Sequence, residues 1–368
     1  MISALRNPGL SGSVLVGLTF CAASAMAEQY AWQLDGGVHR ADTAGSAEID
    51  TTFVTATGYF PPIDDSDGPL ALAPFLSRSS RVSATVAGIE EDYLVTASGP
   101  IGGQPIVSTG GNDSRMYSAS GRYVWRNSGW YAGGGLRSFS IDHPVSGSLD
   151  IDNDRDGYAL SAGKYLAPST ALELEFGSTT SETSILAPLC TPQAPCLFPL
   201  FLGTTKIESE NLGLSVLHAG EVGAMSYAVS GEFSTSDTTI RLTPAPAALP
   251  TGPFSPNPGI PVYASPNADI GQYGPVAVLE ASEVSPPDVD NYQIAGELFP
   301  TSRLGVKLGI AMSDAGNVDL ERTELSVTWF FKRAIAVEFS IAQTEADYSA
   351  GGSIDDDESA IRLIGRLH

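Results

Sequence analysis

Ser302-Arg-Leu-Gly-Val-Lys-Leu-Gly-Ile-Ala-Met312 alternates between two kinds of side chain along its whole length. Large apolar side chains occupy every second position, and Arg303 and Lys307 fall among the small residues between them. A period of two is typical of a β-strand with one apolar and one polar face. The alternation recurs in residues 172–176 and 334–342, so the sequence predicts an all-β protein.

The connections between these strands are sorted by length. Aromatic residues crowd very short turns, as at Tyr165, Phe299 and Trp329, whereas the opposite strand ends lead into longer acidic or Pro-rich stretches, near residues 142–153, 185–203, 243–287 and 348–355. A soluble β-sandwich also alternates, but nothing in its physics sorts its turns in this way. Short turns with an aromatic band at one rim and long loops at the other are typical of outer-membrane barrels.

We therefore predict a transmembrane antiparallel β-barrel of about fourteen strands, with twelve to sixteen as the range left open, in the bacterial outer membrane. An even number puts both termini at the periplasmic rim with the short turns, and the long loops become extracellular. Closure also leaves no unpaired strand edge in lipid. The candidate strands are residues 29–40, 48–60, 81–96, 113–126, 129–142, 155–166, 170–183, 205–218, 222–241, 289–299, 302–313, 319–331, 334–347 and 356–367.

The N-terminal end predicts export. Arg6 precedes an apolar stretch at residues 14–25, and Ala25-Met26-Ala27 offers small residues for cleavage, so residues 1–27 are expected to be a signal peptide. Residues 28–368 would then form a single outer-membrane barrel domain. No later apolar run reaches the roughly 18 residues that a transmembrane helix needs, which excludes a helical inner-membrane protein.

Charge limits the partners. The chain has 19 Lys and Arg against 42 Asp and Glu, a formal net charge of -23. Nucleic acid is excluded as a partner, because phosphate contacts require a basic face. The acidic loops should raise the local concentration of cations at the outer mouth, and arginines on the wall would favour anions, so we expect a weak net preference for cations.

Tyr59-Phe-Pro-Pro-Ile-Asp-Asp-Ser-Asp-Gly-Pro-Leu-Ala-Leu-Ala-Pro-Phe-Leu-Ser-Arg-Ser-Ser80 resembles the linker between two strands in a general porin family of Gram-negative bacteria. The turn at Pro300-Thr-Ser-Arg-Leu-Gly-Val306 and the last four strands also look similar to that family. Its members usually end on an aromatic residue that the barrel-assembly machinery reads, whereas this chain ends at His368. The resemblance implies a porin-type barrel with no catalytic residues and no cofactor.

Charged residues in phase with the polar faces are expected to line the lumen, because an Arg or Lys facing lipid near the midplane would cost about 2–4 kcal/mol. Around eight strands leave a filled interior and roughly 16–18 leave a broad channel, so fourteen predicts an intermediate pore. The Pro-rich residues 243–287 are expected to fold inward and set its constriction. The expected pore-lining charges are Arg122, Arg126, Arg137, Glu173, Glu175, Glu232, Glu297, Arg303, Lys307, Arg322, Glu324, Glu338, Arg362 and Arg366.

Other candidate sites are weaker. Cys190 and Cys196 favour a local disulfide over free thiols in an oxidising compartment. Asp152, Asp154 and Asp156 fit the start of a calcium loop, but Gly163 stands where a bidentate Glu is needed, so an acidic loop without a metal is favoured. The four histidines have no spacing that suggests a metal pair or a catalytic triad, and we expect no enzyme.

The leading functional hypothesis is a porin, a water-filled channel for passive diffusion of small hydrophilic solutes. A substrate-specific transporter and a non-conducting structural or adhesive barrel are the alternatives, and the first of these is suggested by the apolar stretches in residues 185–202. The expected partners are outer-membrane lipids, the barrel-assembly machinery and small solutes. A homotrimer is left open, because lipid-facing and subunit-facing strands have the same composition.

Overall fold

The computed structural model describes residues 29–43, 47–64, 68–97, 106–142, 150–188, 199–244, 282–316, 318–349 and 351–367. Apart from two very short helices, these residues form strands and turns. None of the helices in these ranges is long and apolar enough to cross a membrane.

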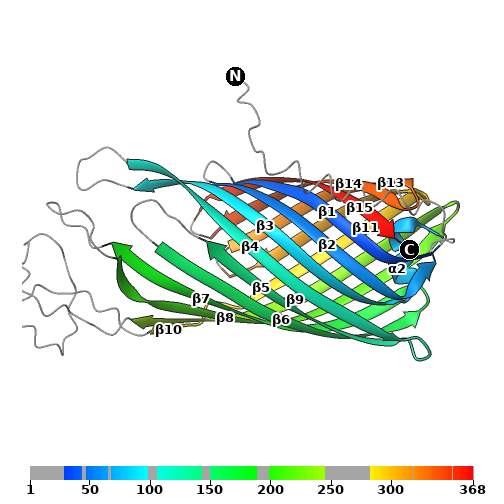
Figure 1. Ribbon diagram of the computed structural model, residues 1–368, viewed down its shortest axis with the longest axis horizontal. Coiled ribbons are helices and arrows are strands. Elements are labelled where there is room, and N and C mark those ends of the chain that lie inside the picture. Colours follow the sequence, from blue (N-terminus) through cyan, green and yellow to red (C-terminus); the bar gives the residue numbers. More distant parts are fainter. Residues whose placement is uncertain are drawn as a thin grey trace, which may run out of the picture.

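Antiparallel pairing joins fourteen strands into a closed ring, because β9 pairs with β8 and β1 pairs with β15 (Figure 1). A three-residue strand, β10 (Ser282–Val284), only extends the pairing at the end of β9. The ring strands are β1 (Gln29–Thr43), β2 (Ala47–Asp64), β3 (Ser80–Ala97), β4 (Ile106–Trp125), β5 (Trp130–Asp142), β6 (Asp150–Ala167), β7 (Thr170–Pro188), β8 (Pro199–Val222), β9 (Met225–Pro244), β11 (Val289–Thr301), β12 (Leu304–Asp314), β13 (Val318–Lys332), β14 (Ile335–Tyr348) and β15 (Ser353–Leu367).

The predicted number of strands is confirmed, and each candidate range lies mainly on one strand of the ring. The differences lie at the strand ends, where the structure generally continues beyond the prediction. β8, for example, has 24 residues, more than the ~9–11 that a tilted strand needs to cross the hydrocarbon core. Such strands project beyond the membrane, and the acidic residues 90–92 lie in the part of β3 that is far from its short-turn end.

Alternation places opposite chemistry on the two faces of the wall. In β12, Leu308 and Met312 are exposed by 54% and 51% on the outer face, while Gly309 between them is buried. Register carries this phase into the neighbouring strand, where Leu325 lies opposite Leu308 and Glu324 lies opposite Gly309. The outside of the ring is therefore apolar and the inside is polar, which is the arrangement of a barrel in lipid.

Aromatic side chains mark the rim with the short turns. Trp125 and Trp130 flank the turn between β4 and β5 and are both exposed, and Tyr123 packs edge-on against Trp125 with ring centroids 5.1 Å apart. The ammonium of Lys164 lies on the same outer face, 5.1 Å from the Trp130 ring centroid. Aromatic residues and a snorkelling lysine are expected at a membrane interface. We assign this rim to the periplasm.

The connections at this rim are short, with one exception. Residues 126–129, 168–169, 223–224, 302–303 and 333–334 are tight turns, and β1 begins and β15 ends at the same level. The exception joins β2 to β3 and contains the 3₁₀ helix η2 (Leu70–Leu72) and the α-helix α2 (Ala73–Leu76). Figure 1 shows α2 at this end of the barrel, next to the end of β15.

Candidate functional site: a charged lumen above an internal plug

Residues 68–79 fold into the barrel, and we call this segment the plug. Gly68 has φ 86°, a left-handed conformation that a side chain would disfavour, and it turns the chain as it enters the plug. Pro74 lies in the first turn of α2, where a missing N–H costs no hydrogen bond. Ser77 ends the helix by donating from its backbone N–H to the Ala73 carbonyl oxygen at 3.0 Å.

The plug packs against the inner wall on several sides. Its apolar side chains fill the periplasmic end because the wall there presents aromatic and small apolar residues instead of charges. Four clusters result: Ala73 with Tyr30, Tyr59 and Ile63; Leu70 with Phe330, Ala336 and Ile364; Leu72 with Ala219, Ala228 and Phe299; and Phe75 beside Val124, Tyr131, Tyr165 and Ala171. These wall residues come from β1, β2, β4–β9, β11 and β13–β15.

Polar contacts fix the plug at Leu70. Its backbone N–H donates to the Ser302 carbonyl oxygen at 2.9 Å, and its carbonyl oxygen accepts from the Arg366 guanidinium at 2.7 Å. The Arg366 guanidinium also lies over the rings of Tyr30 and Phe330, 4.5 and 4.6 Å from their centroids. Arg366 is only 3% exposed. This predicted pore-lining residue therefore holds the plug and does not face the open lumen.

Eleven predicted pore-lining charges share the inward face of the strands, opposite to the apolar outer residues. Arg126 and Arg303 do not, because the strands end before them and both lie exposed in periplasmic turns. The inward residues are Arg122, Arg137, Glu173, Glu175, Glu232, Glu297, Lys307, Arg322, Glu324, Glu338 and Arg362. That they line a conducting pore stays a prediction.

Cross-strand pairing neutralises much of this charge. Arg122 forms an ion pair with Glu173, and the Lys307 ammonium lies 3.4 Å from a Glu324 oxygen. The remaining pairs involve carboxylates and a histidine that the sequence analysis did not include: Arg362 with Asp35 at 3.2 Å and with Glu338 at 3.9 Å, and Glu358 with Arg322 and, at 3.0 Å, with His39. Asp35, His39 and Glu358 are in phase with inward neighbours, so the alternation could have identified them.

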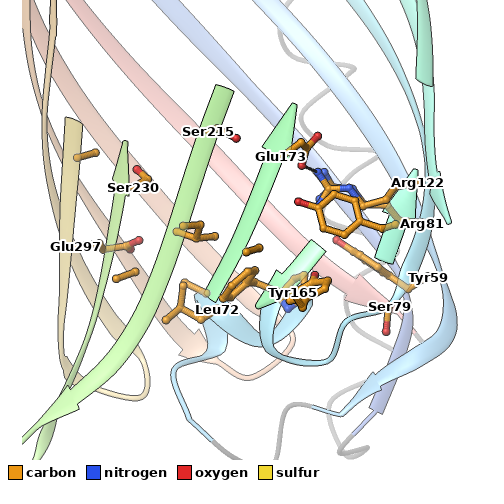
Figure 2. Close-up of a pocket in the computed structure, with 18 of the residues that line it drawn as sticks. Tyr59, Leu72, Ser79, Arg81, Arg122, Tyr165, Glu173, Ser215, Ser230 and Glu297 are labelled. Atoms are coloured by element: carbon orange, nitrogen blue, oxygen red, sulfur yellow. Dashed lines mark hydrogen bonds and ion pairs between the residues drawn. The ribbon is translucent and has the colours of Figure 1, made fainter. Parts of the chain in front are cut away.

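A cavity of about 530 Å³ lies directly above the plug. Ala71, Leu72, Pro74 and Phe75 form its floor, and its wall contains charged residues from strands far apart in the sequence. Figure 2 shows Arg81 and Arg122 together on one side and Glu297 on the opposite side. The predicted pore-lining residues do not include Arg81, although it alternates with the outward Val82 in the same way as they do with their neighbours. The cavity joins an apolar floor to a charged wall.

Several expectations fall on residues outside the described ranges. Cys190 and Cys196 are among them, so the disulfide stays a prediction, as does the signal peptide. Most of residues 243–287 also lie outside, and only their ends are seen, in β9, β10 and the approach to β11. That these residues fold inward stays a prediction, and among the described residues the plug lies in the lumen.

The calcium candidate lies in a strand. Asp152, Asp154 and Asp156 belong to β6, where alternate residues on one face are about 7 Å apart, whereas calcium requires several oxygens within ~2.3–2.6 Å of one ion. The described residues contain no group of three His, Cys, Asp or Glu side chains that could hold a metal. The structure thus has an extended strand where the acidic motif suggested a calcium-binding loop.

No protein-family model and no curated protein matches the chain. Among solved structures, the chain is similar to the outer-membrane protein Omp33 of Acinetobacter baumannii, with 15% identity, a TM-score of 0.49 and coverage of 93% of this chain and 100% of that one. It is also similar to the Pseudomonas putida toluene transporter TodX, with 10% identity, a TM-score of 0.47 and coverage of 96% and 93%. The CymD monoaromatic hydrocarbon channel has 13% identity and a TM-score of 0.42, with coverage of 100% and 95%.

These similarities concern the fold alone. The assignment comes from the chain's own residues, which form a closed ring with an apolar outer face and an aromatic rim. The protein is a fourteen-stranded antiparallel β-barrel of the outer membrane.

Proposed function

We propose that the protein is a water-filled outer-membrane channel for the diffusion of small hydrophilic solutes. The observation that supports this proposal best is the charged inner wall. Ion pairs such as Arg122–Glu173 and Arg362–Asp35 face inward from strands that would otherwise enclose an apolar core. The Arg122 and Arg362 side chains are 22% and 36% exposed toward the interior, and charged groups there need water, since burying them without hydration is costly.

The plug lies in the path through this channel. Because Leu70, Leu72 and Phe75 reach different sectors of the wall, a solute has to pass beside the plug or displace it. We therefore expect a small conductance for the intact protein. Size selection would occur at the periplasmic end, and electrostatic selection would occur along the charged wall above it.

Single-channel recording in planar bilayers tests the proposal. The purified protein should give small current steps, and a variant with residues 70–76 replaced by a Gly-Ser sequence of equal length should give clearly larger ones. The matched control replaces residues 126–128, an exposed turn at the same rim, and should conduct like the natural protein. If the folded plug variant gave no current steps, this result would contradict a channel and favour the structural or adhesive alternative.

A further inference from the structure

Among the described residues, Arg81 is the cation of the cavity that makes no ion pair. It lies on the inward face of β3, exposed, and its cross-strand neighbours are Tyr59 and Arg122. Within the described part of the chain, its guanidinium makes no hydrogen bond and no ion pair. A second guanidinium as a neighbour adds to the positive potential at this position instead of reducing it.

The other two cationic residues of the cavity, Arg122 and Lys307, are ion-paired within the wall. Arg122 is paired with Glu173 and lies over the Tyr131 ring, 4.5 Å from its centroid. Glu297 on the opposite side has Lys307 as its cross-strand neighbour. The side of the cavity that contains Arg81 therefore has an excess positive charge that attracts an anion from the lumen.

The surroundings of Arg81 are apolar and aromatic. Leu72, Pro74 and Phe75 of the plug form the floor beneath it, and Tyr131 and Tyr165 line the same cavity. Figure 2 shows Arg81 and Arg122 close to Tyr59, with Tyr165 and Leu72 lower in the cavity. An apolar surface with a few convergent polar groups is the usual composition of a site for a small organic ligand.

We propose that this cavity binds small organic carboxylates that have an apolar body. The planar guanidinium of Arg81 would hold the carboxylate through two parallel N–H···O bonds, and the body would rest on Leu72 and Phe75. The inference deepens the proposed function by naming a class of solute, and it rests on that function only for passage, because binding to the cavity does not require conduction.

Calorimetric titration of the detergent-solubilised full-length barrel tests the ligand class. Benzoate is the probe, benzamide removes its charge while keeping its shape, and acetate keeps the charge while removing the apolar body. Benzoate should bind about tenfold or more tightly than either, since a hydrogen bond to a charged group contributes on this order. Equal binding of benzamide would overturn the role of charge, and equal binding of acetate would overturn the role of the apolar floor.

Variants test the residue. Arg81→Gln should weaken benzoate binding about tenfold or more, and Arg81→Lys should weaken it less, because an ammonium keeps the charge but loses the bidentate geometry. Arg137→Gln is the matched control, since Arg137 also faces inward but bonds Thr179 and does not line the cavity. Unchanged binding in a correctly folded Arg81→Gln protein would refute the assignment. If the protein gave no current in planar bilayers but still bound benzoate, only the proposed channel function would be refuted.

Discussion

The Arg366 guanidinium donates a hydrogen bond to the Leu70 carbonyl oxygen and thereby joins the last strand of the barrel to the plug, which lies almost three hundred residues earlier in the chain. This contact is buried, and Arg366 also stacks against Tyr30 and Phe330 on the wall. The closing strand thus contributes a side chain that fixes the periplasmic end. Strand pairing alone would close the ring but would leave the plug without this anchor.

Replacing Arg366 should loosen the plug. Arg366→Ala leaves a buried carbonyl oxygen without its donor and removes the stacking on two rings, so the free energy of unfolding should fall by about 1–3 kcal/mol. Denaturant unfolding in detergent measures this change. Arg303→Ala is the matched control, because Arg303 is exposed in a turn at the same rim. An equal loss in both variants would mean that Arg366 has no specific anchoring role.

The two faces of β12 should respond differently to the same substitution. Leu308→Arg places a charge on the lipid face near the middle of the strand and should lower the free energy of unfolding by about 2–4 kcal/mol. Ala311→Arg, three residues later on the inward face, should have a much smaller effect because its guanidinium reaches the lumen. Urea titration in lipid vesicles compares them. Similar losses would contradict the assigned faces.

The ion pair between Arg122 and Glu173 should influence ion selectivity. Glu173→Gln leaves Arg122 beside Arg81 without a compensating carboxylate, so the pore should become more selective for anions. Reversal potentials in a KCl gradient measure the shift, and Glu48→Gln at the far end of β2 is the control. A shift toward cations, or none, would show that this pair does not face the path of the ions.

The fold could be predicted from the sequence because a period of two is a local property. Leu308 and Lys307 indicate opposite faces of their strand, whatever strand pairs with it. Pairing then places residues of the same kind on the same face in neighbouring strands. The same phase identified inward residues such as Glu173 and Arg362. It failed at Arg126 and Arg303 because alternation has meaning only while the chain remains extended, and both residues lie just beyond a strand end.

The plug was not predicted, for a physical reason. Residues 70–76 form two helices of one turn or less, too short for a helical period, and their apolar side chains gain stability only from a wall that the barrel assembles elsewhere in the sequence. From the resemblance to a porin family, residues 59–80 were expected to be only a linker between two strands. In the sequence, Arg366 has the same phase as the other inward arginines. Its burial results from tertiary contacts with the plug and the wall, which the alternation does not show.

The cysteine pair offers a test that does not depend on the barrel interior. Cys190 and Cys196 are separated by a short Pro-containing segment between β7 and β8, and we expect a disulfide there because exported chains mature in an oxidising compartment. Mass spectrometry of the unfolded, unreduced protein after alkylation should then show no added label, and reduction should expose two reactive thiols. Because the predicted signal peptide contains the third cysteine, the same spectrum checks its removal. Labelling before reduction would contradict the disulfide.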